Sequence, residues 1–123
     1  MKLLVTGGAG FIGSNFIRYI LGRYPEYKII NLDKLTYCGN LENLRDVQNN
    51  TNYKFIKGDI CDSKIVQVII KDCDVIINFA ASTHVDRSIL NSTDFVKTNF
   101  YGVFILLEAV RKSKISRFIQ IST

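Results

Sequence analysis

A cluster of glycines close to the N-terminus constrains the fold more than any other feature of the sequence. Residues 6–13 read TGGAGFIG, between a short apolar run at Leu3–Val5 and an amphipathic stretch. The spacing contains GxGxxG and, at Gly7, Gly10 and Gly13, GxxGxxG. Glycine permits a tight turn and close backbone approach, and a helix N-terminus offers free N–H groups. The segment predicts a strand-turn-helix unit that binds an anion through its backbone.

Five short apolar runs predict strands, because most are rich in β-branched or aromatic residues and are bounded by Gly, Asp, Asn or Ser. The runs are Leu3–Val5, Lys28–Leu32, Tyr53–Ile56, Val75–Phe79 and Arg117–Ile121. The continuous apolar character of residues 75–77 is typical of a parallel strand that helices cover on both faces.

Helical patterns separate these runs. An apolar stripe at spacings of three and four residues predicts a helix over Thr93–Lys112. Its members are Phe100, Val103, Phe104, Leu107 and Val110. A second stripe, at Ile12, Phe16 and Ile20, predicts a helix that begins near Gly10 and ends before Pro25. Weaker patterns predict helices at Leu41–Val47 and Ser63–Lys71. Alternating strands and helices favour an α/β fold, a doubly wound parallel sheet of Rossmann type.

Length and composition limit the class of protein. The chain has 123 residues, less than one domain of about 150 residues, so a second full domain is excluded. With 47% hydrophobic and 22% charged residues and one proline, the composition is that of a packed globule. The net charge of +5 is dispersed, and its densest patch, at Arg111, Lys112, Lys114 and Arg117, flanks an expected helix end. We therefore expect no nucleic-acid partner.

The cysteines and the apolar runs exclude further classes. The three cysteines, Cys38, Cys61 and Cys73, form no CxxC pair, and His84 is the one histidine, so no zinc site is expected. The N-terminal apolar run is too short for a signal peptide, and no run reaches the roughly 18 apolar residues of a membrane span. We expect a reduced, cytoplasmic protein without a membrane segment.

An acidic residue ends the second expected strand. Asp33 lies 20 residues after Gly13, the spacing at which a dinucleotide-binding unit places a carboxylate on the adenosine ribose. A carboxylate there accepts bonds from the ribose hydroxyls of NAD and repels the 2′-phosphate of NADP, although Lys34 beside it weakens that exclusion. The alternative is a glycine turn that serves packing alone. Strand, glycine turn, helix and acid together favour NAD.

Several segments in succession resemble one enzyme family. The quoted stretches are residues 6–15, 33–40 (DKLTYCGN), 58–60 (GDI), 78–88 (NFAASTHVDRS), 98–99 with Gly102, and 120–123 (QIST). They are similar to the dTDP-glucose 4,6-dehydratase family of the extended short-chain dehydrogenase/reductase superfamily. Residues 82–88 are the stretch that separates this family from its sister enzymes. One departure is Ser82-Thr83, where the family usually carries Glu-Ser.

The resemblance implies a set of binding residues. Asp59 would accept from the amino group of adenine, and Ile60 would pack on its ring. The cofactor-binding residues implied are Gly7, Gly10, Phe11, Ile12, Gly13, Asp33, Lys34, Leu35, Thr36, Asp59, Ile60, Phe79, Ala80, Ala81 and Thr98. Thr83 and Thr123 would contact the substrate, dTDP-glucose.

The family's chemistry needs residues that this sequence does not display. The family removes a hydride from carbon 4 of glucose with NAD⁺, eliminates water across carbons 5 and 6, and returns the hydride to carbon 6. It uses a helical Tyr-x-x-x-Lys and an Asp-Glu pair directly after the threonine that Thr123 resembles. Tyr24–Lys28 and Tyr53–Lys57 have that spacing, but Pro25 follows the first tyrosine and the second pair lies on an expected strand.

We therefore assign no catalytic residue. Residues 1–123 are expected to form the NAD-binding domain of a longer dehydratase, with a sheet incomplete at its C-terminal side. The resemblance also implies that the full-length protein is a homodimer. The other interpretations are a UDP-sugar 4-epimerase, a UDP-glucuronate decarboxylase or a non-catalytic NAD-binding module.

Four polar residues near the distinctive stretch have predicted roles short of catalysis. His84 is expected to be structural rather than catalytic, because a single loop histidine is more often hydrogen-bonded than reactive. Asp86 and Arg87 form an ion pair with each other, or Arg87 holds a substrate or a neighbouring chain. Asn99 is expected to position the neighbouring loop.

Overall fold

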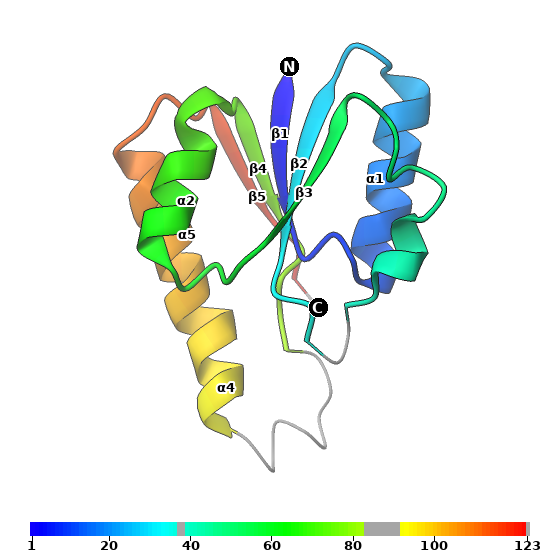
Figure 1. Ribbon diagram of the computed structural model, residues 1–123. Coiled ribbons are helices and arrows are strands. Elements are labelled where there is room, and N and C mark those ends of the chain that lie inside the picture. The colour runs from blue at the N-terminus through cyan, green and yellow to red at the C-terminus, as the bar shows by residue number, and fades with distance from the viewer. Residues whose placement is uncertain (37–38, 83–91, 123) are drawn as a thin grey trace.

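The computed structural model describes residues 1–36, 39–82 and 92–122, which form one parallel sheet with helices on both faces (Figure 1). The sheet has five strands in the order β3-β2-β1-β4-β5. Their bounds are β1 (Lys2–Thr6), β2 (Lys28–Asp33), β3 (Tyr53–Lys57), β4 (Val75–Asn78) and β5 (Arg117–Gln120). The doubly wound fold is confirmed, and the predicted strand ends differ from the observed ones by at most one residue.

The helices divide between the two faces of the sheet. Helix α1 (Phe11–Arg23) and the 3-10 helix η1 (Leu41–Leu44) cover one face. Helix α2 (Ser63–Ile69), its 3-10 extension η2 (Ile70–Asp72) and a long helical row cover the other (Figure 1). That row consists of α4 (Ser92–Val96), the π-helix η3 (Lys97–Gly102) and α5 (Val103–Arg111).

The helix predicted at Leu41–Val47 is wrong in part, because only a 3-10 helix and turns form there. The backbone bonds run from residue i to i+3, as from Arg45 N–H to the Glu42 carbonyl. Asn40 accepts from the N–H of Glu42 and so begins the short helix. Asp, Asn and Gln dominate residues 46–50, and short polar side chains of this kind compete for backbone hydrogen bonds.

Each face of the sheet has its own apolar core. Alternate residues of β1 point to opposite faces, so Leu4 packs beneath α2 and α5 whereas Leu3 and Val5 pack beneath α1. The predicted burial of β4 on both faces is confirmed, since Val75 to Asn78 are all buried. The edge strand β5 differs, because Arg117, Ile119 and Gln120 are exposed and only Phe118 is half-buried.

The apolar stripe predicted for the last helix is only in part the face that packs on the sheet, since Val103 and Val110 are half-buried and Val110 packs against the core. Phe100, Phe104 and Leu107 are 69%, 54% and 47% exposed. The buried residues of this row are instead Gly102, Ile105, Leu106 and Ala109. The row is apolar on two faces. The buried face contains the small residues Gly102 and Ala109, which let the helix approach its neighbours more closely. Periodicity alone does not distinguish the two faces.

In helix α1, too, the predicted apolar stripe and the buried face differ, here at the first turn. Its buried residues are Gly13, Ser14, Ile17, Ile20 and Leu21. Of the predicted stripe, Ile20 is buried and Phe16 is half-buried, but Ile12 is 62% exposed. The exposed residue lies at the carboxyl end of the strands, where the candidate site is found.

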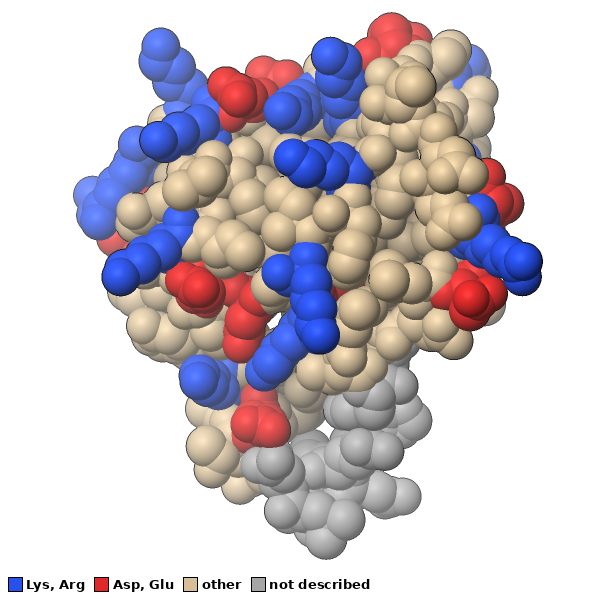
Figure 2. Space-filling model, in the orientation of Figure 1, with Lys and Arg blue, Asp and Glu red and all other residues tan. Residues whose placement is uncertain are grey.

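Charge is spread over the surface. On the face shown in Figure 2, Lys and Arg side chains are scattered, with Asp and Glu between them. No helix among the described residues is both long enough and apolar enough to cross a membrane.

Candidate functional site

A cleft of about 440 Å³ lies at the carboxyl ends of the strands. It is formed by the glycine turn, the loops after β2, β3 and β4, and the start of the π-helix. All of the predicted cofactor-binding residues line it except Leu35, namely Gly7, Gly10, Phe11, Ile12, Gly13, Asp33, Lys34, Thr36, Asp59, Ile60, Phe79, Ala80, Ala81 and Thr98. The prediction did not include Leu32, Gly39, Gly58, Ser82 and Ile121, which also line it.

The glycine turn is too crowded for side chains. Gly7 has a φ of 72°, and a Cβ there would lie 2.5 Å from the backbone nitrogen of Ala80. A Cβ on Gly13 would lie 2.5 Å from the carbonyl oxygen of Gly7. Gly10 is the N-cap of α1 and brings no side-chain cap. The first N–H groups of the helix therefore face the cleft with their partial positive charge.

Asp33 holds the turn in place. Its side chain is 8% exposed. One carboxylate oxygen accepts from the N–H of Ala9 and the other from the N–H of Leu35, both at 2.8 Å. A carboxylate oxygen accepts more than one bond, so Asp33 retains acceptor capacity toward the cleft.

Asn31 is a second support that the sequence analysis missed. Its Oδ1 accepts from the N–H of Gly8 at 3.0 Å, and its Nδ2 donates to the hydroxyl of Tyr53 at 3.1 Å. Burial raises the pKa of Tyr53, which packs against the core beneath α1. Two residues of β2 thus bind two successive residues of the glycine turn.

Two of the residues that line the cleft form an ion pair. Lys34 Nζ lies 3.2 Å from Oδ2 of Asp59. Partial burial raises the pKa of Asp59, but the bond from the N–H of Cys61 at 2.9 Å and the Lys34 ammonium outweigh it, so the pKa lies below its usual range. Asp59 is therefore an ionised acceptor at the cleft, and the Lys34 charge is engaged with it rather than with Asp33.

Leu35 differs from the other predicted cofactor-binding residues, because its side chain does not line the cleft. Its backbone has a φ of 58°, and its side chain packs against the apolar core beneath α1. Its N–H binds Asp33, which ties this left-handed residue to the acid. Leu35 therefore shapes the cleft through its backbone.

Hydrogen bonds fix the ends of β1, β4 and β5 beneath the cleft. Buried Asn78 accepts from the Thr6 hydroxyl and from the N–H of Ala80, and donates to Oε1 of Gln120 at 2.8 Å. These bonds link three neighbouring strand ends. They set the path of the backbone at Ala80 and Ala81 along the cleft wall.

Asn99 holds the loop after β4. Its Oδ1 accepts from the N–H of Ser82 at 2.9 Å, and its Nδ2 donates to the carbonyl of the same residue at 3.2 Å. The predicted positioning role of Asn99 is confirmed. The residue lies in the π-helix, a feature that is frequent at functional sites.

Some of the predictions concern residues that the structure does not describe. The residues concerned are Thr83, Thr123, His84, Asp86 and Arg87, which lie outside the described residues. Tyr53 and Lys57 lie on β3, and Tyr24 and Lys28 are separated by the turn between α1 and β2, so neither pair shares a helix. No group of three or more potential metal ligands occurs in the described part of the chain.

Comparison with known proteins identifies the family. The profile described as GDP-mannose 4,6 dehydratase matches residues 4–123. The chain belongs to this family. It is 47% identical over 124 residues to human dTDP-D-glucose 4,6-dehydratase, and 52% identical over 114 residues to the dTDP-glucose 4,6-dehydratase of Escherichia coli. The matches cover 99% and 91% of this chain but 35% and 31% of those proteins, so the chain spans about a third of their length.

Solved structures show the same architecture. The dTDP-glucose 4,6-dehydratase of Bacillus anthracis, solved in complex with NAD, matches with a TM-score of 0.90 and 46% identity, covering 100% of this chain and 37% of that one. A UDP-glucose 4-epimerase from Thermotoga maritima matches with a TM-score of 0.88 and 34% identity, covering 100% and 38%. Members of this family and sister enzymes thus share the fold, and sequence identity is higher with the dehydratase.

Proposed function

We propose that the chain is the NAD-binding part of a dTDP-glucose 4,6-dehydratase. The observation that carries the proposal is the cleft itself, where an uncapped helix N-terminus, a glycine turn without room for side chains and the Asp33 carboxylate meet. This arrangement fits a dinucleotide, because it presents N–H donors to a pyrophosphate and an acceptor to a ribose. Identity of 47% to human dTDP-D-glucose 4,6-dehydratase supports the specific family member.

Each wall of the cleft has a role in this proposal. Backbone N–H groups of residues 10–13 bind the pyrophosphate, and Asp33 accepts from the adenosine ribose. Asp59 and Ile60 contact adenine. The nicotinamide half lies along Phe79, Ala80 and Ala81, with Thr98 beside them; Leu35 acts through its backbone. The Asp33 carboxylate repels a 2′-phosphate, so NAD is preferred over NADP.

The proposed substrate is dTDP-glucose, and the reaction is that of the whole protein. When bound, NAD⁺ would accept a hydride from carbon 4 of the sugar and return it to carbon 6; with loss of water across carbons 5 and 6, the whole protein would give dTDP-4-keto-6-deoxyglucose. Thr83 and Thr123 remain the proposed substrate contacts. In the described residues, Asn99 and Asn78 position the loop that leads to Thr83.

The compartment and the oligomeric state are part of the same proposal. Cys61 and Cys73 carry free thiols, as in a reducing compartment, and we assign the protein to the cytoplasm.

Large apolar side chains are exposed along one side of the α4–α5 row. A contiguous exposed apolar surface of this kind is typical of a protein–protein contact. They are Val96, Phe100, Tyr101, Phe104 and Leu107. We assign this apolar face to a homodimer contact.

The full-length protein with dTDP-glucose tests the proposal. A 4-keto-6-deoxy product without added cofactor, and NAD released on denaturation, are expected. A 4-epimerised sugar nucleotide as product would instead support the epimerase, whose fold matches with a TM-score of 0.88. Bound NAD without turnover would leave a non-catalytic module, and absence of NAD binding would overturn the proposal altogether.

A further inference from the structure

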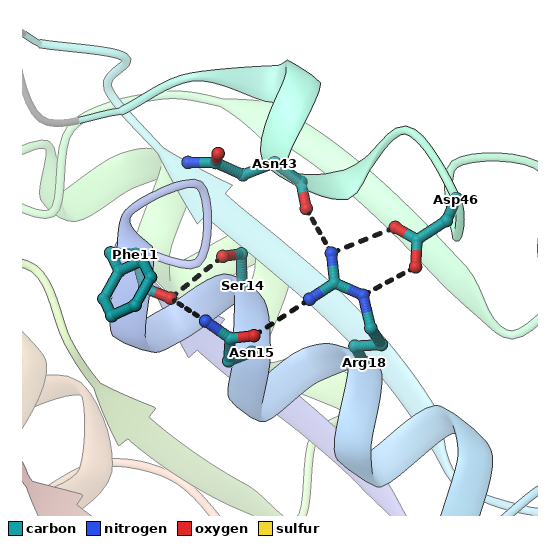
Figure 3. Close-up of polar contacts among 6 residues, drawn as sticks. All are labelled: Phe11, Ser14, Asn15, Arg18, Asn43 and Asp46. Carbon is teal, nitrogen blue, oxygen red and sulfur yellow. Dashed lines mark hydrogen bonds and ion pairs between the residues drawn. The ribbon is translucent and has the colours of Figure 1, made fainter.

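A single arginine ties helix α1 to the segment that follows β2. Arg18 donates from Nε to Oδ2 of Asp46 at 2.6 Å and from Nη2 to Oδ1 at 3.1 Å, a bidentate pair. Nη2 also donates to the carbonyl of Asn43 at 2.6 Å, and Nη1 donates to Oδ1 of Asn15 at 3.0 Å. Figure 3 shows the guanidinium between α1 and the η1 segment, surrounded by these partners. We call these four residues the Arg18 clamp.

On the side of α1, the clamp reaches the first turn of the helix. Asn15 Nδ2 donates to the carbonyl of Phe11 at 2.8 Å, and the hydroxyl of Ser14 donates to the same oxygen at 3.0 Å (Figure 3). Phe11 lines the cleft. The clamp is therefore connected to the helix end that faces the proposed pyrophosphate.

On the other side, the clamp reaches the glycine turn through Asn43. While its carbonyl accepts from Arg18, its Nδ2 donates to the carbonyl of Ala9 at 2.9 Å. The same oxygen of Ala9 accepts from the N–H of Asn40 at 3.1 Å, and the N–H of Ala9 binds Asp33. Ala9 thus links the turn to β2 and to the segment after it.

The segment held in this way has little regular structure and few buried apolar residues. Among the described residues from 34 to 46, η1 supplies the regular structure, Leu44 is 1% exposed, and Leu35 packs half-buried against the core beneath α1. Its residues Lys34, Thr36 and Gly39 nevertheless line the cleft. A segment with few buried contacts opens readily, and ordering it on binding costs affinity.

A purely stabilising role accounts poorly for the clamp. The side chains of Arg18 and Asp46 are 40% and 54% exposed, and exposed ion pairs add little to global stability. The hydrogen bonds from Arg18 hold the pKa of Asp46 below its usual range, so the pair stays charged near neutral pH. The clamp, however, joins two elements that form the cleft, helix α1 and the segment after β2. This position suits a role in shaping the cleft.

We propose that the Arg18 clamp positions the adenosine side of the cleft, by holding the segment after β2 against the glycine turn before the dinucleotide binds. Arg18 touches neither ligand nor reacting atoms in this account and acts through Asn43 and Ala9. The inference rests on the proposed NAD function.

The test compares ligand affinities of the full-length protein and its variants by calorimetry. Arg18→Ala and Asp46→Ala are each expected to weaken NAD and ADP-ribose by the same factor, about tenfold, with little change in the unfolding midpoint. The double variant should lose no more than Arg18→Ala alone, because the two residues act as one unit. Arg18→Lys keeps the charge but loses the bidentate geometry of the guanidinium. Its affinities should lie between those of the unsubstituted protein and Arg18→Ala.

A neighbouring ion pair provides the matched control. Arg45 and Glu42 lie 3.8 Å apart in the same segment, and their side chains are 78% and 73% exposed. Arg45→Ala should leave both affinities unchanged. In the ligand-free protein, amide hydrogen exchange at Gly39 and Asn40 should speed up in Arg18→Ala and stay unchanged in Arg45→Ala.

The outcomes separate this inference from the function on which it rests. Absence of NAD binding by the unsubstituted protein would remove the proposed function. If that protein binds NAD, an Arg18→Ala variant with the same NAD affinity as the unsubstituted protein overturns the positioning role of the clamp. A lowered midpoint with unchanged affinity, or an equal loss in Arg45→Ala, also overturns it.

Discussion

Helix α1 and the α4–α5 row both expose large apolar side chains, but the exposed residues have different surroundings. Phe11 and Ile12, at 80% and 62% exposed, sit on the first turn of α1 and line the cleft with the glycine turn. Phe100 and Phe104, at 69% and 54% exposed, follow a helix face away from that cleft. In the proposed function, the first set therefore contacts the dinucleotide, whereas the second, a contiguous row along one helix face, contacts a second copy of the chain.

The largest expected effect comes from the glycine turn. Gly13→Ala should weaken NAD binding by at least about 100-fold, or roughly 3 kcal/mol, because its Cβ would lie 2.5 Å from the Gly7 carbonyl oxygen and 2.8 Å from Gly8 Cα. Those atoms are backbone, so the turn itself must move. Calorimetric titration of the full-length protein measures the change. Unaltered affinity in a folded variant would show that the turn does not hold the cofactor.

The second prediction separates the two exposed apolar sets. Phe104→Ser should weaken dimerisation by about tenfold or more through loss of buried aromatic area, and leave NAD affinity unchanged. Phe11→Ser should do the reverse. Sedimentation velocity over a concentration series, with NAD titration in parallel, measures both properties.

Val68 gives the control for that pair, since it is 64% exposed on α2 outside both surfaces. Val68→Ser should alter neither property. Loss of association in Phe11→Ser, with Phe104→Ser unaffected, would reverse the assignment of the two surfaces.

Asn99 marks the place where the α4–α5 row meets the cleft. Asn99→Ala removes both bonds to the Ser82 backbone and should lower the free energy of unfolding by about 1–2 kcal/mol while leaving association intact. Asn99→Asp keeps the acceptor and should lose less. Denaturant titration combined with sedimentation checks this. A dimerisation defect in Asn99→Ala would show that Asn99 also serves the dimer contact, contrary to the separation of the two regions.

The smallest effect is expected at the far end of α1. A Cβ on Gly22 would meet nothing within 4 Å, so Gly22→Ala should stabilise the protein by about 0.5–1 kcal/mol through the better helix propensity of alanine. NAD affinity should not change. Thermal unfolding and titration together make this the matched control for Gly13→Ala; a loss of affinity here would mean that more than the first turn of α1 serves the cleft.

Local sequence patterns were sufficient for much of the fold and the cleft. The strands follow from continuous apolar runs, and the glycine turn with Asp33 follows from spacing, because both depend on short stretches of chain. The other members of the fifteen-residue cofactor set came from the family resemblance, and all of the set but Leu35 line the cleft.

The missed features depend on contacts between distant residues. In the sequence, Asn31 is only a polar residue within an apolar run. Its bond to Gly8 forms because the fold places β2 beside the glycine turn. The buried face of α5 depends on which apolar face the sheet selects. Ser82 and Ile121 reach the cleft because they follow β4 and β5, which the fold places next to each other on the β4 side of β1.

The most direct test of the central claim is a calorimetric titration of the full-length protein, freed of bound nucleotide, with NAD and with NADP. The account predicts that NAD binds at least about tenfold more tightly, because the Asp33 carboxylate repels a 2′-phosphate. Asp33→Asn should reduce that preference. Equal or tighter binding of NADP, or no binding of either dinucleotide, would contradict it.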